Sequence, residues 1–293
     1  MLRPMDPTEA LHIRHACPAA GGGWQARLEL AYARDGDRTV PVLRRHSGPL
    51  RVQKGLLPEG PGVWHQVIVH PPGGIAAGDR LDIDVRAAAG AHVLLTAPGA
   101  AKWYRSAAGA AEQALAIDVA AAAAVEWLPP ENIVFDGARA RLRTRLRVAA
   151  GGTLIAGELF SLGRPACGER FAHGELRTEL QVLRDGAPLY AEHAVLPGGH
   201  RLLDAPVGLA GRALFGMLVA VSDRIADATL AACRACAAAL PGELAVTRRG
   251  CVLLARWRGA RADEGLRALR AVWAVLRPML LGRDAVAPRL WAT

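Results

Sequence analysis

Apolar and polar residues alternate in many short segments of this chain, and this period of two constrains its fold more than any other feature. In residues 24–32, Trp24, Ala26, Leu28 and Leu30 alternate with polar side chains, as in a strand with one buried face. The same pattern predicts strands at residues 65–69, 81–85, 92–96, 115–119, 141–148, 153–160, 175–182 and 189–195. Many short strands at close spacing are typical of an all-β body.

Helical periodicity is confined to the C-terminal half. Residues 223–240 are rich in alanine, with Asp223 placed to cap the start of a helix. Residues 263–281 carry leucine, valine and tryptophan at helical spacing, with Asp263 as a second candidate cap. Residues 250–257 are mostly apolar and predict a buried strand between the two helices.

No linker, composition shift or fixed-length repeat divides the 293 residues, of which 52% are hydrophobic. We therefore predict a mainly β single domain over residues 1–293, a β-helix-like or sandwiched all-β scaffold with two helices in its C-terminal half. Residues 1–20 are expected to be flexible. The C-terminal tail is expected to be extended and to dock on the body through Trp291.

Composition argues against several classes of protein. No run of about 18 apolar residues could span a membrane, and no apolar segment follows the N-terminus as in a secretion signal, so we expect a cytoplasmic protein without a membrane partner. The net charge of +9 comes almost entirely from arginine. Arginines alternate along residues 141–148 as one solvated strand face, but aromatic side chains for base stacking are missing beside them. Nucleic-acid binding is therefore disfavoured.

Two of the cysteines lie three positions apart in the sequence. Among five cysteines, Cys233 and Cys236 form a CxxC within the first predicted helix. No second CxxC and no nearby histidine completes a set of four ligands. We interpret both as small core residues, since positions i and i+3 share one helix face.

A loop rich in proline and glycine interrupts the strand pattern. It begins at His70, continues through Pro72, Gly73 and Gly74, and ends at Asp79. Proline fixes φ and removes a donor, and glycine supplies conformations that other residues avoid. The segment is either a shaped functional loop or a plain turn, and its residues alone do not decide between them.

Carboxylates within apolar strands are the most suggestive residues chemically. Glu158 and Glu192 interrupt two predicted strands, and Glu126 precedes a tryptophan in a third apolar segment. Each could simply face solvent. Together with Asp79, they could line a wet internal passage for a divalent cation, because hard oxygen ligands at several weak sites suit transfer better than storage.

Enzymatic motifs are missing from the sequence. It contains no GxSxG, Walker A loop, GxGxxG after a strand, or HExxH. The alternative kept open is an enzyme that acts on a small acidic ligand, with Lys102, Arg105 and Asp79 in an all-β pocket.

The order of motifs along the chain carries a resemblance. The motifs occupy residues 48–54, 58–60, 70–75, 78–81, 96–106, 126–131, 135–138, 163–174 and 276–291. In this order they resemble the UreD (UreH) family of urease accessory proteins, from about residue 24 to the C-terminus. Departures are mild: Ala77, Trp103 and Pro130 stand where the family usually has glycine, phenylalanine and glutamine.

The resemblance implies a non-enzymatic maturation factor with a β-helix-like scaffold. It implies binding to apo-urease and to UreF, which recruits the GTPase UreG, and passage of transient Ni²⁺ without any tightly bound cofactor. On this interpretation Asp79, Glu158 and Glu192 face the nickel passage. The weaker candidates for the passage are Glu126, Glu131 and Glu169.

Other motif residues have competing interpretations. The Asp79 carboxylate could instead cap backbone amides of its own loop, and Arg164 could form a structural pair with Glu169. Lys102, Tyr104 and Arg105 follow a tight turn at Pro98 and Gly99, and they either buttress that loop or meet a partner. The UreF-facing surface is expected in the C-terminal half, on residues 263–281 and the tail.

Overall fold

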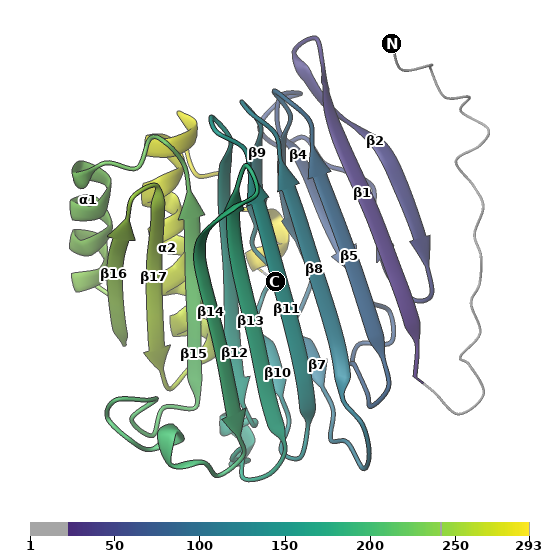
Figure 1. Cartoon of the computed structure of the whole chain (residues 1–293), viewed down its shortest axis with the longest axis vertical. Helices are drawn as coiled ribbons and strands as arrows, with labels where there is room; N and C mark the ends of the chain where they lie inside the picture. Colours follow the sequence, from purple (N-terminus) through teal and green to yellow (C-terminus); the bar gives the residue numbers. More distant parts are fainter. Residues whose placement is uncertain (1–22, 241, 293) are drawn as a thin grey trace.

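The computed structural model describes residues 23–240 and 242–292. Within them the chain forms two β-sheets packed face to face, and two helices cover the outer face of one sheet (Figure 1). The expected flexibility of residues 1–20 lies outside the described residues. The expected scaffold is confirmed: it is mainly β, with two helices in the C-terminal half.

Seven strands form what we call sheet 1. In spatial order they are β14 (Ala187–Pro197), β13 (Glu175–Arg184), β11 (Arg139–Val148), β8 (Ala111–Val119), β5 (Arg80–Ala87), β1 (Gln25–Asp35) and β2 (Arg38–Ser47). Sheet 2 runs through β16 (Glu243–Arg249), β17 (Val252–Gly259), β15 (Leu214–Val221), β12 (Thr153–Leu162), β9 (Ala124–Trp127), β6 (His92–Thr96), β4 (Trp64–Val69) and β3 (Arg51–Val52). Two short strands, β7 (Ala101–Trp103) and β10 (Asn132–Val134), extend sheet 2 beside β12.

Successive strands from β4 to β13 are distributed between the two sheets in the manner of a β-solenoid. Where two of these strands are neighbours in a sheet, they are parallel. Parallel pairing in register stacks like residues across strands. One such row on the inner face of sheet 1 runs through Leu30, Val85, Ile117, Leu146 and Val182. All five are buried, so the alternation seen in the sequence becomes a continuous aliphatic core between the sheets.

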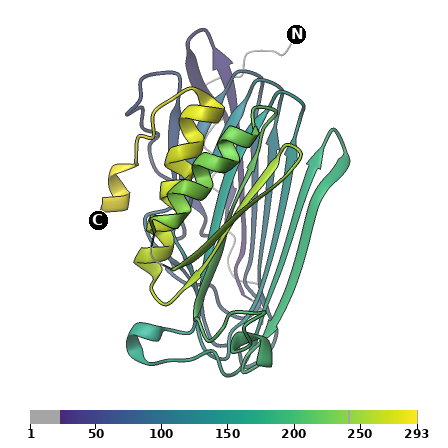
Figure 2. The same cartoon turned by 90° about the vertical axis from the view of Figure 1, so that its left-hand side faces the viewer.

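The two helices make a third layer against sheet 2 (Figure 2). Helix α2 (Ala262–Leu281) buries Leu269, Val272 and Leu276 against the face of sheet 2 that points away from sheet 1. Its bounds agree with the prediction to one residue, and Gly282 ends it in the left-handed conformation. No described helix is both long and apolar enough to cross a membrane.

The start of the first helix was predicted wrongly. Helix α1 covers Asp227–Ala238, and Ala226 occupies its N-cap position. Asp223 instead accepts a hydrogen bond from the Gly151 amide at 2.8 Å and pairs with Arg184. The Asp223 carboxylate therefore links the turn between β11 and β12 to the end of β13.

Several strands escaped the sequence pattern, among them β2, β15 and β16. Strand β15 lies in the middle of sheet 2, with sheet 1 on one side and α2 on the other. A strand buried on both faces has no reason to alternate, and residues 214–221 indeed form a nearly continuous apolar run.

The C-terminal tail docks through Trp291, as expected, but by a 3₁₀ turn at Arg289–Ala292 rather than an extended segment. The Trp291 ring lies edge-on to Trp273 with centroids 5.3 Å apart, and the Arg270 guanidinium lies 4.2 Å from its centre. Its Nε1–H donates to Thr96 Oγ1 at 3.0 Å. The tail therefore ties α2 to β6.

Replacing Trp291 tests this docking. We expect Trp291→Ala to lower the free energy of unfolding by about 2–3 kcal/mol, because aromatic packing and one hydrogen bond are lost. Trp291→Phe keeps a ring and should lose about half as much. Urea denaturation followed by circular dichroism measures both; equal stability of the alanine variant and the parent would contradict a docked tail.

Candidate functional site

Glu158 occupies an exceptional position between the two sheets. It lies on the inner face of β12 between Ala156 and Phe160, which belong to the buried core. Its side chain lines two cavities, of about 470 Å³ and about 290 Å³. The larger, which we call the edge cavity, lies between β13–β14 and β15–β17; the smaller, the loop cavity, is lined by the loop that starts at His70. Glu158 is thus common to both cavities.

A row of paired residues leads from Glu158 across sheet 2 to β17, the strand next to its edge. Glu158 pairs with Met217 on β15, and Met217 pairs with Arg256 on β17. Neighbouring strands lie about 4.8 Å apart, so the backbones at the two ends of the row are separated by roughly 10 Å. All three residues line the edge cavity.

A matching row crosses sheet 1. Thr144 pairs with Leu180 on β13, and Leu180 pairs with Glu192 on β14. The two rows are joined at both ends. Thr144 Oγ1 donates to Glu158 Oε1 at 2.8 Å, and the Arg256 guanidinium lies 2.6 Å from Glu192 Oε2. The structure therefore brings the predicted residues Glu158 and Glu192 together around one cavity.

The pKa values of the two carboxyl groups are shifted in opposite directions. Burial raises the pKa of Glu158, the nearby charge of Glu192 raises it further, and the hydrogen bond from Thr144 only partly opposes this. Burial also acts to raise the pKa of Glu192, but hydrogen bonds from Tyr190 and Arg256 outweigh it and leave that pKa below its ordinary value. Glu192 is therefore ionised more readily than Glu158.

The loop cavity gathers several motif residues predicted from the sequence. His70, Gly73, Gly74, Lys102 and Glu131 all line it. The His70 Nε2 atom is buried and has no hydrogen-bond partner among the described residues. Burial lowers the pKa of His70 although the charge of Asp79 opposes this, which favours the neutral imidazole that binds metal ions.

The glycine-rich loop has a local packing reason for its sequence. Gly73 adopts a φ of +73°, which favours glycine. At Gly74 an added Cβ would lie 2.0 Å from a ring carbon of Tyr104, so the aromatic ring seals directly against the backbone. Tyr104 in turn packs edge-on against Phe135 at 5.2 Å. Tyr104 thus buttresses the loop, whereas Pro72 is exposed.

Asp79 is buried but lies outside the residues that line these two cavities. Its carboxylate accepts hydrogen bonds from the amides of Trp24 at 2.6 Å and Ala76 at 2.7 Å. These are the bonds of the capping role that the sequence left open. They fasten the glycine-rich loop to the chain entering β1.

Substitution of Asp79 tests the capping role. Asp79→Ala leaves two amides without their acceptor, and we expect it to lower the free energy of unfolding by about 2–4 kcal/mol. Asp79→Asn keeps one acceptor oxygen and should lose less. Thermal unfolding of both variants measures the loss. An alanine variant as stable as the parent chain would contradict the capping role of Asp79.

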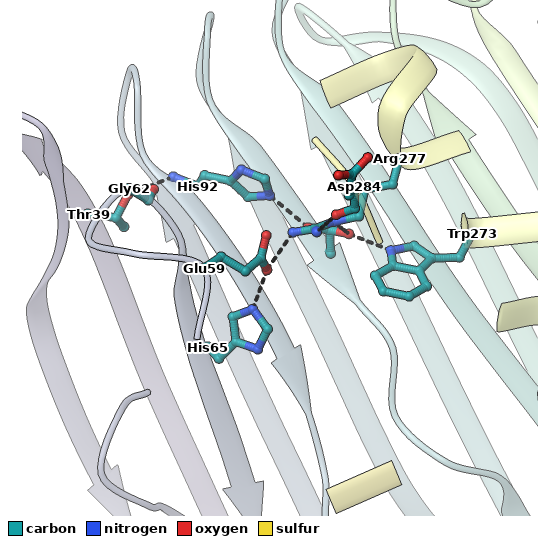
Figure 3. Close-up of polar contacts among 9 residues, drawn as sticks. Thr39, Glu59, Gly62, His65, His92, Trp273, Arg277 and Asp284 are labelled. Atoms are coloured by element: carbon teal, nitrogen blue, oxygen red, sulfur yellow. Dashed lines mark hydrogen bonds and ion pairs between the residues drawn. The ribbon is translucent and has the colours of Figure 1, made fainter. Parts of the chain in front are cut away.

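Glu126 points away from both cavities. Its neighbours Val125 and Trp127 face the core between the sheets, whereas its own side chain faces helix α2. It is completely buried and bonds to His92 Nε2 at 2.7 Å, to Arg277 Nε at 3.1 Å and to the Trp273 indole (Figure 3). The sequence expected a weak passage candidate here, and the structure shows a structural anchor for α2.

Arg277 extends this anchor to a second carboxylate (Figure 3). The fully buried guanidinium lies 2.7 Å from Glu59 Oε1 and also donates to the Asp284 carbonyl. Glu59 is itself bonded to His65 at 2.6 Å. Sequence reasoning missed Arg277, although its position four residues after Trp273 placed a charge on the buried stripe of the helix.

This network predicts a pH-dependent stability. Burial acts to raise the pKa of Glu126, but His92 and Arg277 outweigh it, so the pKa lies below its ordinary value of 4.5. A carboxylate with a lowered pKa in the folded state stabilises the fold fully above pH 4.5 and loses this effect as the pH falls through the folded pKa. We expect Glu126→Gln to cost about 3 kcal/mol at pH 7, because Arg277 loses a buried partner.

The measurement is urea denaturation of the parent chain and Glu126→Gln between pH 7 and pH 3.5. The difference in unfolding free energy should shrink below pH 4.5, the ordinary pKa of the group. A difference that stays constant over this range would show that the charge of Glu126 does not contribute.

The remaining motif residues do not join the cavities. Arg164 and Glu169 form the expected pair through two contacts of 3.0 Å. Arg105 is largely exposed and pairs with Asp136. Of the three residues of the alternative enzyme site, Lys102 lines the loop cavity, whereas Arg105 pairs with Asp136 and Asp79 bonds to two backbone amides.

The cysteine pair of helix α1 belongs to the packing of that helix. Cys233 is fully buried in the cluster beneath α1 and α2, and burial raises its pKa to about 11. Cys236 on the same helix is partly buried. Across residues 23–240 and 242–292, no group of three or more histidine, cysteine, aspartate or glutamate side chains is arranged to hold a metal ion.

Three residues of the site were missed from the sequence: Thr144, Met217 and Arg256. Thr144 stands where the inward positions of its strand are otherwise alanine, leucine and valine, so a polar residue on a buried face was the available signal. Arg256 lies on the inner face of β17, two positions after the core residue Leu254. Met217 gave no signal, because an apolar residue in an apolar run is unremarkable.

Comparison with known proteins identifies the family. The model of the UreD urease accessory protein family matches residues 25–292. The chain is 50% identical to urease accessory protein UreD of Pseudomonas aeruginosa PAO1 over 273 residues, covering 92% of this chain and 95% of that protein. It is 49% identical to UreD of Pseudomonas fluorescens Pf-5 over 92% and 95% of the two chains, and 46% identical to UreD of Azoarcus sp. BH72 over 95% and 97%. The chain belongs to the UreD family of urease accessory proteins.

Proposed function

We propose that this chain is a non-enzymatic maturation factor that holds apo-urease together with UreF and, through UreF, the GTPase UreG, while Ni²⁺ passes through its interior to urease. Membership of the UreD family supports the role in urease maturation. The observation that carries the passage is the position of Glu158, a single carboxyl group that lines both interior cavities.

The chemistry of the cavity walls suits transfer of this cargo. A divalent cation that must leave again needs few ligands at each station. The loop cavity offers the unpartnered imidazole of His70, and the edge cavity offers the carboxylate of Glu192. Glu158 lies between them, bonded to one neutral hydroxyl and to no cation among the described residues.

The raised pKa of Glu158 supports release as well as binding. A raised pKa disfavours the ionised form of Glu158, which is the form that binds a cation, and this cost weakens the affinity. The Thr144 hydroxyl can donate a hydrogen bond to Glu158 whether that carboxyl group is protonated or ionised, and so keeps it oriented in both states. Weak, oriented binding at Glu158 is what a relay station between two cavities requires.

The test is nickel loading of urease in cells that co-express this chain with UreF, UreG and the urease subunits at limiting nickel. Glu158→Gln keeps the size of the side chain and its bond to Thr144 but removes the charge. We expect it to lower the nickel content of purified urease at least about fivefold, while the tagged chain still recovers UreF and urease.

The matched control is Glu112→Gln, the same chemical change on the outer face of β8, where Glu112 pairs with Arg141. It should leave nickel loading at the parent level. If Glu158→Gln also loads urease fully, the passage does not run past Glu158. If omission of the whole chain leaves urease fully loaded, the maturation role itself is wrong.

A further inference from the structure

The edge cavity contains a positive charge where a nickel passage would need a free carboxylate. The Arg256 guanidinium lies 2.6 Å from Glu192 Oε2, and the same nitrogen bonds to the Tyr190 hydroxyl. Tyr190 also donates to Glu192 Oε2. One carboxylate oxygen therefore already holds an arginine and a phenol.

We propose that Arg256 is a built-in competitor for Ni²⁺, which occupies Glu192 in the free protein and must swing away before this carboxylate can take up the metal. The proposal rests on the passage proposed above. It assigns the outer end of that passage to Glu192, and it makes Arg256 the residue that closes this end.

The geometry supports competition. Arg256 and Glu192 project from the inner faces of opposite sheets, on edge-proximal strands β17 and β14. A guanidinium on the carboxylate blocks the same lone pairs that would coordinate a metal, and its charge repels a second cation over such distances. Nickel at Glu192 and Arg256 at Glu192 therefore exclude each other.

The surroundings also allow Arg256 to move. Its side chain is 42% exposed and that of Glu192 is 37% exposed, so the pair lies at the rim of the sandwich, where β13 and β14 diverge from β16 and β17 (Figure 2). An arginine at such a rim can exchange its partner for water at small cost. By contrast, the completely buried Arg277 has no such freedom.

A purely structural interpretation makes the opposite prediction. If the pair only fastens the edges of the two sheets together, removal of Arg256 should weaken or leave unchanged the binding of metal. If Arg256 competes, its removal should strengthen binding, and a damaged fold would not produce such a gain.

The experiment is isothermal titration of the purified full-length chain with Ni²⁺ alone at pH 7.5. We expect Arg256→Gln to tighten Ni²⁺ binding roughly fivefold or more, as expected when a partly exposed ion pair no longer competes. The double variant Arg256→Gln/Glu192→Gln should lose this gain. Tyr190→Phe, which removes the hydroxyl shared by both groups, should tighten binding about twofold and serves if Arg256→Gln fails to fold.

The matched control is Arg147→Gln. Arg147 pairs with Asp118 on the outer face of sheet 1, with side-chain exposures of 43% and 35% that resemble those of the Arg256 pair. The Arg147→Gln variant should bind Ni²⁺ with the affinity of the parent chain. Unchanged or weaker binding by folded Arg256→Gln, with weaker binding by Glu192→Gln, would overturn the competitor role but keep the passage. Unchanged binding by both Glu158→Gln and Glu192→Gln would overturn the passage and the competitor together.

Discussion

Taking a carboxylate out of water costs several kcal/mol unless another group compensates its charge, and the interior of this protein is organised by that cost. Asp79 is compensated by two backbone amides and Glu126 by Arg277 and His92, and Glu192, which is partly exposed, pairs with Arg256 and Tyr190. Among the described residues, Glu158 has the hydroxyl of Thr144 as its one hydrogen-bond partner. The first two fasten elements together, whereas Glu158 and Glu192 line a cavity.

The compensated groups explain how the layers hold together. The Glu126–Arg277 pair joins a strand of sheet 2 to α2 across 151 positions of sequence, and Arg277 continues to Glu59 in a loop before β4. Breaking one partner of such a pair is costly because the other charge stays buried. Helix α2, sheet 2 and the loop before β4 are therefore coupled at one point, the buried guanidinium of Arg277.

Much of the fold could be predicted from the sequence, and the missed strand β15 shows one limit of alternation. Alternation located most strands of sheet 1, such as β11, because one face of that strand is exposed and the other is buried. Alternation missed β15, which is packed on both faces. Of the candidate carboxylates, Glu158 and Glu192 do lie around one cavity, but Glu126 does not, since an isolated glutamate in an apolar segment carries no information about which layer it will face.

The sequence by itself determined the β body, the two late helices and, through the order of its motifs, the family. Local periodicity and turn chemistry suffice for these, because they depend on neighbours along the chain. Only the tertiary structure decided which charge meets which: Glu192 meets Arg256 across 64 positions, and Asp79 meets the Trp24 amide across 55. These pairings follow from strand order and from the stacking of two sheets. Residue spacing within a single strand or helix carries no information about strand order or sheet stacking.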